Sequence, residues 1–229
     1  MYTLYIANKN YSSWSLRPWV LMRTLELPFE ERLVPFGTRA FHSFSPTGLV
    51  PCLHHNGVIV WESLSIVEYL AEQDARVWPT SPEARAWARS ATAEMHAGFQ
   101  RLRSTCTFNV GVRVALPPHS DALTRELTRL AQLWQEGIER FGGPFLAGRA
   151  FTAVDAFFAP VAFRMQTYGL ELPARARAYA ELLLKLPAMM DWQEAALQEP
   201  WRDLPHEAEL QQLGEVVADL RVPAHSSPA

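Results

Sequence analysis

The spacing of apolar and polar residues divides the chain into two parts. Residues 1–77 combine short runs typical of strands with helix-type spacing, in the order strand, helix, strand, loop, hairpin and helix. The predicted ranges are 1–7, 16–27, 29–34, 52–55, 58–61 and 63–73. Strands that alternate with helices in this way indicate a small α/β unit.

The hairpin has the clearest local signal of these elements. Asn56 and Gly57 separate its two apolar runs. An Asn-Gly pair suits the positive φ angles of a type I′ turn. We therefore expect residues 52–55 and 58–61 to pair in antiparallel fashion.

Helix-type spacing dominates the rest of the chain. A linker is predicted at 78–82, because Ser81 can cap a helix whose first residue is Pro82. The predicted helices cover 82–104, 120–141, 152–167, 174–185 and 187–198. The pattern weakens after these helices, so we expect an all-helical domain over 83–205 and a loose C-terminal tail over 206–229.

Composition narrows the classes of function. The 229 residues are 48% hydrophobic and 20% charged, with a net charge of −3 and scattered basic side chains. This profile predicts a globular protein that binds neither nucleic acid nor an anionic membrane. The sequence shows no secretory signal pattern, and no run reaches the roughly 18 apolar residues that span a bilayer.

Cysteine and histidine usage adds a prediction about location and metals. Cys52 and Cys106 are too few for a disulfide framework, which favours a reduced, cytoplasmic protein. His54 and His55 have no further ligands near them in the sequence. We therefore expect no metal site.

Residues 11–19 join the first strand to the first helix and are rich in serine. We call the part that holds Ser12, Ser13 and Ser15 the serine loop. We expect Ser15 to cap the helix, so that Pro18 falls in the first turn, where a proline loses no hydrogen bond. Ser12 and Ser13 would then lie just ahead of the positive helix end, a place that favours anions, including a thiolate. The alternative is that these serines only cap the helix.

Two more segments place polar groups where elements begin. Pro51 precedes a strand, and the Val50–Pro51 bond is a candidate for the cis isomer, which would expose the backbone of Val50. Ser63 can cap the next helix, whose free N–H groups suit a carboxylate, while Glu62 suits an ammonium group. The pair matches an amino-acid head group, and the alternative is an ordinary helix cap.

A fourth motif lies in the helical part, where Thr152 and Asp155 form a variant of the capping box that we assign to folding. The four motifs, in this order, resemble the glutathione transferase superfamily over nearly the whole chain. SSWSLRPW resembles the serine motif of the zeta class (SSCSWRVR), and GLVPCL is similar to the cis-proline segment. WESLSIVEYL resembles the motif that holds the γ-glutamyl group, and FTAVDAFFAPV resembles the capping box of the sixth helix.

The resemblance implies a fold. It is the two-domain fold of the superfamily, with an α/β thioredoxin-like N-terminal domain over 1–77 and an all-α C-terminal domain. The resemblance also implies a homodimer in which the first domain of one subunit faces the helical domain of the other.

The resemblance further implies roles for matching residues. Ser12 or Ser13 would donate a hydrogen bond to the glutathione sulfur and so favour its thiolate. Superposing the serine pairs of the two motifs selects Ser12, whereas counting back from Arg17, as in delta-class enzymes, selects Ser13. The other implied glutathione contacts are the backbone of Val50 before Pro51, Glu62 and Ser63 for the γ-glutamyl group, and Arg39 or His42, by location alone, for the glycyl carboxylate.

Three positions depart from the zeta pattern. Trp14 stands where that motif has cysteine, Leu49 stands where it has glutamine, and Thr167 stands where it has arginine. Arg164, one turn earlier, could take the place of that arginine. These departures argue against maleylacetoacetate isomerase activity without affecting glutathione binding.

A second pocket, for an electrophile, is expected between the serine loop and the helices after the linker. Its predicted residues are Trp14, Met95, His96, Phe99, Arg103, Phe108 and Arg164. The alternative for each is a place in the core, as for most stripes at helical spacing. Arg101, Arg103 and Arg113 would favour an acidic substrate.

We therefore expect a glutathione transferase with glutathione as co-substrate and no metal. The thiolate would attack a small electrophile, in a conjugation or in a glutathione-dependent isomerisation. The alternative is a non-catalytic binding or scaffold protein of the same fold. A thiol–disulfide oxidoreductase is disfavoured, because that chemistry needs a cysteine at the start of the first helix.

Overall fold

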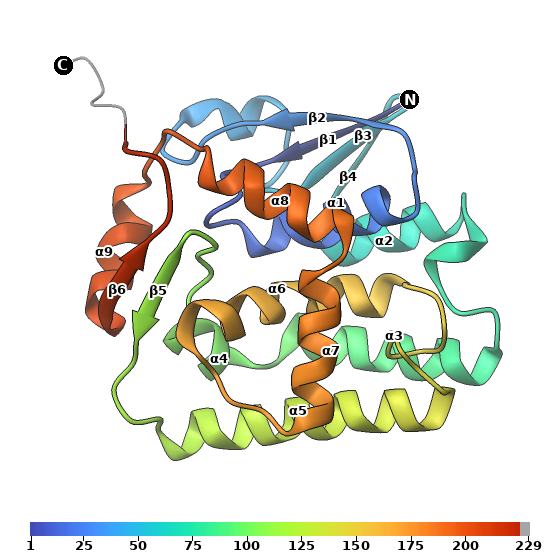
Figure 1. Cartoon of the computed structure of the whole chain (residues 1–229). Coiled ribbons are helices and arrows are strands. Elements are labelled where there is room, and N and C mark those ends of the chain that lie inside the picture. The colour runs from blue at the N-terminus through green and yellow to red at the C-terminus, as the bar shows by residue number, and fades with distance from the viewer. Residues whose placement is uncertain (225–229) are drawn as a thin grey trace.

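The computed structural model describes residues 1–224 and has a four-stranded sheet in its N-terminal part (Figure 1). The strands are β1 (Tyr2–Ile6), β2 (Phe29–Leu33), β3 (Cys52–His55) and β4 (Val58–Trp61), in the order β2-β1-β3-β4. β1 is parallel to β2 and antiparallel to β3, and β3 pairs with β4 as the predicted hairpin. Asn56 and Gly57 have φ angles of 49° and 81°, as a type I′ turn requires.

Two helices, α1 (Ser13–Thr24) and α2 (Ser63–Ala71), lie between the sheet and the helical part of the molecule (Figure 1). α1 begins earlier than predicted, because Ser12 and not Ser15 is its N-cap residue. Pro18 consequently lies inside the helix rather than in its first turn. A proline there has no N–H to offer, so the carbonyl of Trp14 lacks its helical donor.

The rest of the described chain is mainly helical. Its helices are α3 (Pro82–Ala97), α4 (Gln100–Thr105), α5 (Asp121–Phe141), α6 (Ala153–Tyr168), α7 (Ala174–Leu184), α8 (Pro187–Leu197) and α9 (Leu204–Leu213), and two short 3-10 helices are η1 (Arg39–Ser43) and η2 (Ala75–Val77). None of the helices formed by residues 1–224 combines the length and the apolar character that crossing a bilayer demands.

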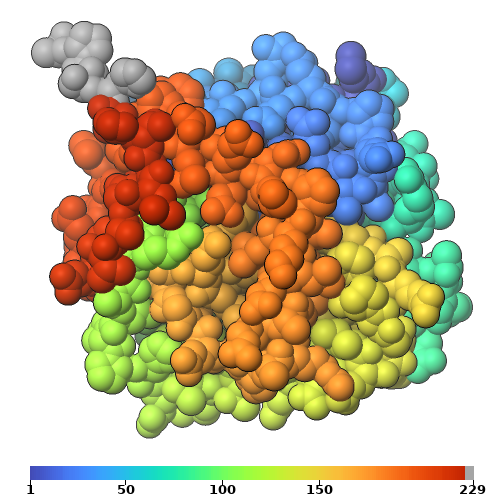
Figure 2. Space-filling view, in the orientation of Figure 1, coloured from blue at the N-terminus to red at the C-terminus, as the bar shows by residue number. Residues whose placement is uncertain are grey.

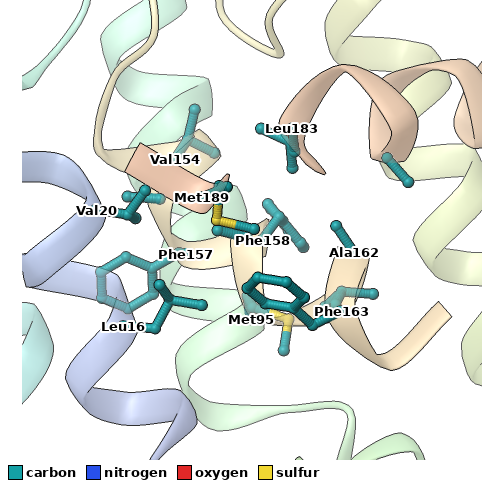
Figure 3. Close-up of a cluster of buried hydrophobic side chains, with 14 of the residues drawn as sticks. Leu16, Val20, Met95, Val154, Phe157, Phe158, Ala162, Phe163, Leu183 and Met189 are labelled. Atoms are coloured by element: carbon teal, nitrogen blue, oxygen red, sulfur yellow. The ribbon is translucent and has the colours of Figure 1, made fainter. Parts of the chain in front are cut away.

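α6 forms the centre of the molecule. All of its residues except Gln166 are buried. In Figure 3, Leu16 of α1 lies beside Phe157 of α6, and Met95 of α3 lies beside Phe163 of the same helix. Leu183 of α7 and Met189 of α8 belong to the same cluster. One hydrophobic core therefore joins the α/β part to the helical part and fixes α1, whose N-terminus carries the serine loop.

The predicted capping box at the start of α6 is confirmed. Asp155 accepts hydrogen bonds from the backbone N–H of Thr152 at 2.9 Å, the N–H of Leu146 at 3.0 Å and the Tyr179 hydroxyl at 2.8 Å. Complete burial still raises the pKa of Asp155 to about 6, because desolvation outweighs these donors.

The predicted helix over 82–104 is wrong in one respect, since it breaks into α3 and α4. Phe99 adopts a left-handed conformation with φ of 58°, while its side chain stays buried in the core. Arg103 of α4 donates to the carbonyls of Met95, His96 and Gly98, which end α3. The break is thus stabilised by a side chain that satisfies the free carbonyls of the helix end.

The expectation of a loose tail is also wrong for the described residues. After α9, β6 (Glu215–Asp219) pairs antiparallel with β5 (Val112–Ala115), which lies in the region predicted as purely helical. Figure 2 shows this red C-terminal segment packed against the green segment that contains β5. Residues 225–229 of the predicted tail lie outside the described residues.

Candidate functional site

Two cavities adjoin at the serine loop. The cis-proline cavity, of about 380 Å³, is lined by Tyr11, Ser12, Trp14, Phe36, Phe41, Thr47, Leu49, Val50, Pro51, Glu62 and His206. The arginine cavity, of about 360 Å³, is lined by Tyr11, Ser13, Trp14, His96, Gln100, Arg103, Thr107, Phe108, Arg164, His206 and Glu209. Tyr11, Trp14 and His206 line both cavities, so these three side chains mark the boundary between them.

The cis-proline cavity takes its name from the Val50–Pro51 bond, which is cis as predicted. No backbone hydrogen bond joins Val50 to another of the described residues. The backbone N–H and C=O of Val50 therefore remain available to a ligand, and a peptide could pair with them as it would with a strand edge.

The start of α2 offers a second set of free polar groups. Glu62, not Ser63, occupies the N-cap position, with φ of 69°, and its side chain makes no capping bond. The predicted side-chain cap at Ser63 is therefore wrong, and the first amides of α2 stay uncapped. Ser63 is fully buried and does not line either cavity, and its hydroxyl bonds to no other residue in the described part of the chain. An uncapped helix N-terminus with an unsatisfied hydroxyl suits a carboxylate.

The two serines at the start of α1 differ in how their hydroxyls are used. Ser12 donates to Ser15 Oγ at 2.7 Å and accepts from the Ser15 N–H at 3.4 Å. Ser13 makes no side-chain hydrogen bond to another described residue. A ligand sulfur at the boundary of the cavities can therefore take a hydrogen bond from Ser13 directly, or from Ser12 once it releases Ser15.

Arg17 is a buried cation behind this loop. Arg17 is 1% exposed, and its Nε and Nη1 bond to no residue among 1–224. The guanidinium lies 4.1 Å from the ring centroid of Trp14 and 4.6 Å from that of Phe157. Burial, followed by repulsion from Arg103 and Arg164, holds the pKa of Arg17 well below its usual value. The negative charge of Glu62 acts against this shift without reversing it. A buried charge that is only partly compensated is costly, and an anion bound nearby would offset that cost.

Two further arginines face the arginine cavity. Arg164 is 5% exposed and donates Nε–H to the Cys106 carbonyl at 2.7 Å, while its two terminal nitrogens bond to none of the described residues. Burial and the neighbouring Arg103 lower the pKa of Arg164 to about 10, so it stays protonated at neutral pH. A planar guanidinium whose two terminal NH2 groups are free is suited to bidentate binding of a carboxylate.

His96 completes this wall of the arginine cavity. Its ring meets Trp14 edge to face at 5.3 Å between centroids, and its buried Nδ1 has no hydrogen-bond partner in the part of the chain that the structure describes. Burial, and then the charge of Arg17, lowers the pKa of His96. The imidazole is therefore neutral at pH 7.

The C-terminal segment contributes residues that sequence patterns did not reveal. His206 Nδ1 lies 2.5 Å from Asp203 Oδ2, and the imidazole stacks on Tyr11 with 5.1 Å between ring centroids. The Tyr11 hydroxyl donates to Glu207 at 2.6 Å and accepts from Arg221 at 3.0 Å. The sequence signal for His206 is an aspartate, Asp203, three residues before it. That spacing is too common to predict a functional site.

The structure separates the predicted site residues into two groups. Those that line a cavity are Ser12, Ser13, Trp14, Val50, Pro51, Glu62, His96, Arg103, Phe108 and Arg164. The prediction that Met95 and Phe99 line the second pocket is corrected, because both side chains pack in the hydrophobic core and line neither cavity.

Arg39 and His42 do not line the cis-proline cavity either. Both are exposed on η1, and Phe41 is the residue of that turn that faces the cavity. The His42 ring instead covers Gly48, where an added Cβ would come within 2.3 Å of it. Arg17 belongs to the serine motif, but the sequence around it did not indicate that it is buried. Its burial depends on the packing of α1 against α6.

Comparisons with known sequences agree with this geometry. Residues 11–73 match the family model described as glutathione S-transferase, N-terminal domain. The chain is 35% identical to glutathione S-transferase GstB of Escherichia coli over 107 residues, which cover 40% of this chain and 51% of that protein. It is 26% identical to maleylacetoacetate isomerase of Rattus norvegicus over 135 residues, 58% of this chain and 61% of that protein. The chain thus spans about half the length of the first of these relatives.

Solved structures match over a larger share of the chain. A glutathione transferase homolog from Burkholderia, with bound glutathione, is 25% identical, with a TM-score of 0.67 over 85% of this chain and 97% of that one. A Tau class glutathione S-transferase from mango is 19% identical, with the same TM-score over 93% and 97% of the two chains. The expected fold is therefore confirmed: the chain has the glutathione transferase fold, and its residues 11–73 match the N-terminal domain model of the glutathione S-transferases.

Proposed function

We propose that the protein is a glutathione transferase that uses glutathione as co-substrate and activates its thiol at the serine loop. The observation that carries this proposal is the meeting of the two cavities at Ser12, Ser13 and Trp14. One cavity offers groups that suit a peptide, and the other offers space and charge for a second substrate. Homodimerisation and a cytoplasmic location, which the family resemblance implies, stay predictions.

Glutathione fits the cis-proline cavity by its chemistry. The γ-glutamyl carboxylate would take the free amides of α2 and the unpaired Ser63 hydroxyl, while Glu62 would face the ammonium group. The cysteinyl unit would pair with the backbone of Val50. Because Arg39 and His42 lie outside this cavity, we expect them to contribute little to binding of the glycyl carboxylate.

The sulfur would then lie at the boundary of the cavities. An ordinary thiol has a pKa near 8.5. A hydroxyl donor from Ser12 or Ser13, the N-terminus of α1 and the Arg17 charge would all favour the thiolate. The thiolate would attack an electrophilic carbon held in the arginine cavity, in a conjugation or in an isomerisation that later releases glutathione.

The charge of the arginine cavity supports an acidic electrophile. Arg164 presents its two free terminal NH2 groups, and Arg103 lies beside it. Glu209, at the exposed rim, is the only acidic residue that lines this cavity within residues 1–224. Such a site would hold a carboxylate while the reactive carbon faces the serine loop. The alternative, a non-catalytic scaffold, leaves the unpaired Arg17 and Ser63 without a purpose.

Calorimetry of glutathione binding at neutral pH tests the proposal, with thiolate absorbance followed in the wild type and in Ser12→Ala and Ser13→Ala. We expect binding in all three and loss of the thiolate signal in one variant, which names the activating serine. Turnover of a chloronitrobenzoate should exceed that of its methyl ester, and Arg164→Met should remove the difference. Absence of glutathione binding in the wild type would refute the proposal.

A further inference from the structure

His206 lines both cavities from a segment outside the N-terminal domain, and Asp203 pairs with it to form a dyad. We infer that His206, oriented by Asp203, accepts the thiol proton of glutathione and is thereby a catalytic base. The inference rests on the proposed function, since it concerns the same sulfur. The serine hydroxyls can donate to the thiolate, but they leave open where its proton goes.

The dyad geometry sets the tautomer of the imidazole. Asp203 caps α9, and its Oδ2 accepts from the backbone N–H of His206 at 3.3 Å as well as facing Nδ1 at 2.5 Å. A carboxylate only accepts, so Nδ1 carries the proton of the neutral ring. Nε2 is then the nitrogen with a free lone pair, and the carboxylate stabilises the imidazolium that forms when it takes a proton.

Packing holds the ring of His206 in place. It stacks on Tyr11, and it lies 5.0 Å from the ring centroid of Phe36. Tyr11 is itself fixed by Glu207 and Arg221. His206 Nε2 bonds to none of the described residues, and the side chain is 33% exposed, so a proton on Nε2 can leave to water.

The other polar residues at the boundary are poorer bases. The Tyr11 hydroxyl is engaged by Glu207 and Arg221, and burial raises its pKa far above neutrality. His96 lines only the arginine cavity, and burial beside Arg17 disfavours its protonated form. Trp14 has no basic nitrogen. His206 is therefore the boundary residue that combines a free lone pair, a counter-ion and a path to solvent.

The proton transfer balances as follows. The S–H bond breaks, its electron pair stays on sulfur, and an N–H bond forms at Nε2. The sulfur then attacks carbon. In a displacement the leaving group departs with its electron pair and the imidazolium releases its proton to water; in an addition the proton passes to the carbanion.

Several titratable or charged groups surround the dyad. The titratable or charged side chains that face His206 are Asp203, Glu207 and Glu209 of α9, Tyr11, Arg221, Glu62, and His96, Arg103 and Arg164 across the arginine cavity. These groups are unchanged in a substitution of His206 alone, so the difference between the two pH profiles belongs to the imidazole.

The test compares the full-length wild type with His206→Gln, Asp203→Asn and a control, His55→Gln. Asparagine is a good N-cap residue, so the Asp203 variant keeps the start of α9. His55 bonds the Tyr69 hydroxyl at 2.9 Å and lines neither cavity. Readouts are glutathione affinity by calorimetry, thiolate absorbance against pH, and kcat/KM against pH with a neutral chloronitrobenzene.

We expect His206→Gln to bind glutathione with similar affinity but to lose about a hundredfold in kcat/KM at neutral pH, the low end for a general base. Its thiolate signal and its activity should rise only near the pH at which a free thiol ionises. The kcat/KM of Asp203→Asn at neutral pH should lie between the values of His206→Gln and the wild type. His55→Gln should have the kcat/KM and the pH profiles of the wild type.

Two results would overturn the inference. One leaves the proposed function standing, and the other refutes the proposed function as well. If the wild type binds and turns over glutathione while His206→Gln keeps both pH profiles, only the role of the dyad is lost. If the wild type does not bind glutathione at all, the proposed function fails and the dyad role fails with it.

Discussion

The carboxylate of Glu199 binds Asn10 twice, through the backbone N–H at 3.2 Å and the side-chain amide at 3.1 Å. It also accepts from the backbone N–H of Lys9. Glu199 follows α8, so this buried side chain fastens the helical part to the start of the serine loop. Burial raises the pKa of Glu199 although these donors oppose it.

Glu199→Gln should loosen the serine loop. A glutamine amide cannot accept from every donor that the carboxylate serves, and a buried N–H left without a partner costs about 1–3 kcal/mol of unfolding free energy. We expect that loss in urea denaturation, together with weaker glutathione binding. Glu194→Gln, at an exposed position of α8, is the control and should change neither. An unchanged midpoint in Glu199→Gln would contradict this role.

Ser12→Ala and Ser13→Ala should differ in stability. Ser12 is the N-cap of α1, and replacing such a residue with alanine costs about 1 kcal/mol. Ser13 makes no side-chain hydrogen bond within the described residues. The unfolding free energy of Ser13→Ala should therefore stay within about 0.5 kcal/mol of the wild-type value. Thermal unfolding without glutathione measures both. Equal losses would mean that Ser12 does not act as the cap.

Arg17→Met should stabilise the protein without ligand and impair its chemistry. An apolar side chain of similar size removes the cost of a buried, unpaired charge, and we expect a gain of about 1 kcal/mol despite the lost contacts with Trp14 and Phe157. The thiolate signal of bound glutathione should move to higher pH. Arg89→Met, at an exposed arginine, is the control. A clear loss of stability would show that Arg17 is well compensated.

Acid should weaken the contacts of the C-terminal segment. Burial alone would raise the pKa of Glu207, but the Arg221 guanidinium and the Tyr11 hydroxyl outweigh it, and the net shift is downward. A lowered carboxyl pKa contributes stability at neutral pH that is lost as pH falls through the folded-state pKa.

Thermal unfolding between pH 3 and 7 checks this consequence. The wild type should lose stability below about pH 5, where carboxylates begin to protonate. Glu207→Gln should start less stable at neutral pH and show a flatter dependence. Parallel curves for the two proteins would contradict the prediction.

Local chemistry explains which features could be predicted from sequence. The Asn56-Gly57 turn and the Thr152–Asp155 capping box depend on a few adjacent residues, and both are present. The cis bond before Pro51 is also present, but the adjacent residues made it only a candidate, and the resemblance to the cis-proline segment of the family implied it. The start of α1 was misplaced because Ser12, Ser13 and Ser15 are all acceptable caps.

Long-range contacts explain what sequence could not reveal. β5 and β6 are short, and each is stabilised by a partner far away along the chain. Arg17 is buried only because α1 packs on α6. His206 reaches the cavities because β6 and Arg221 hold the C-terminal segment beside Tyr11. No local period or motif encodes such relationships.

The pairing of β6 with β5 has a consequence for how the protein is made. The α/β part leaves the ribosome first, and N-terminal domains generally begin to fold while later residues are still being added. His206 and Arg221 join Tyr11 only after translation has passed both of them. A nascent chain halted before α9 would thus carry the serine loop but lack one wall of each cavity.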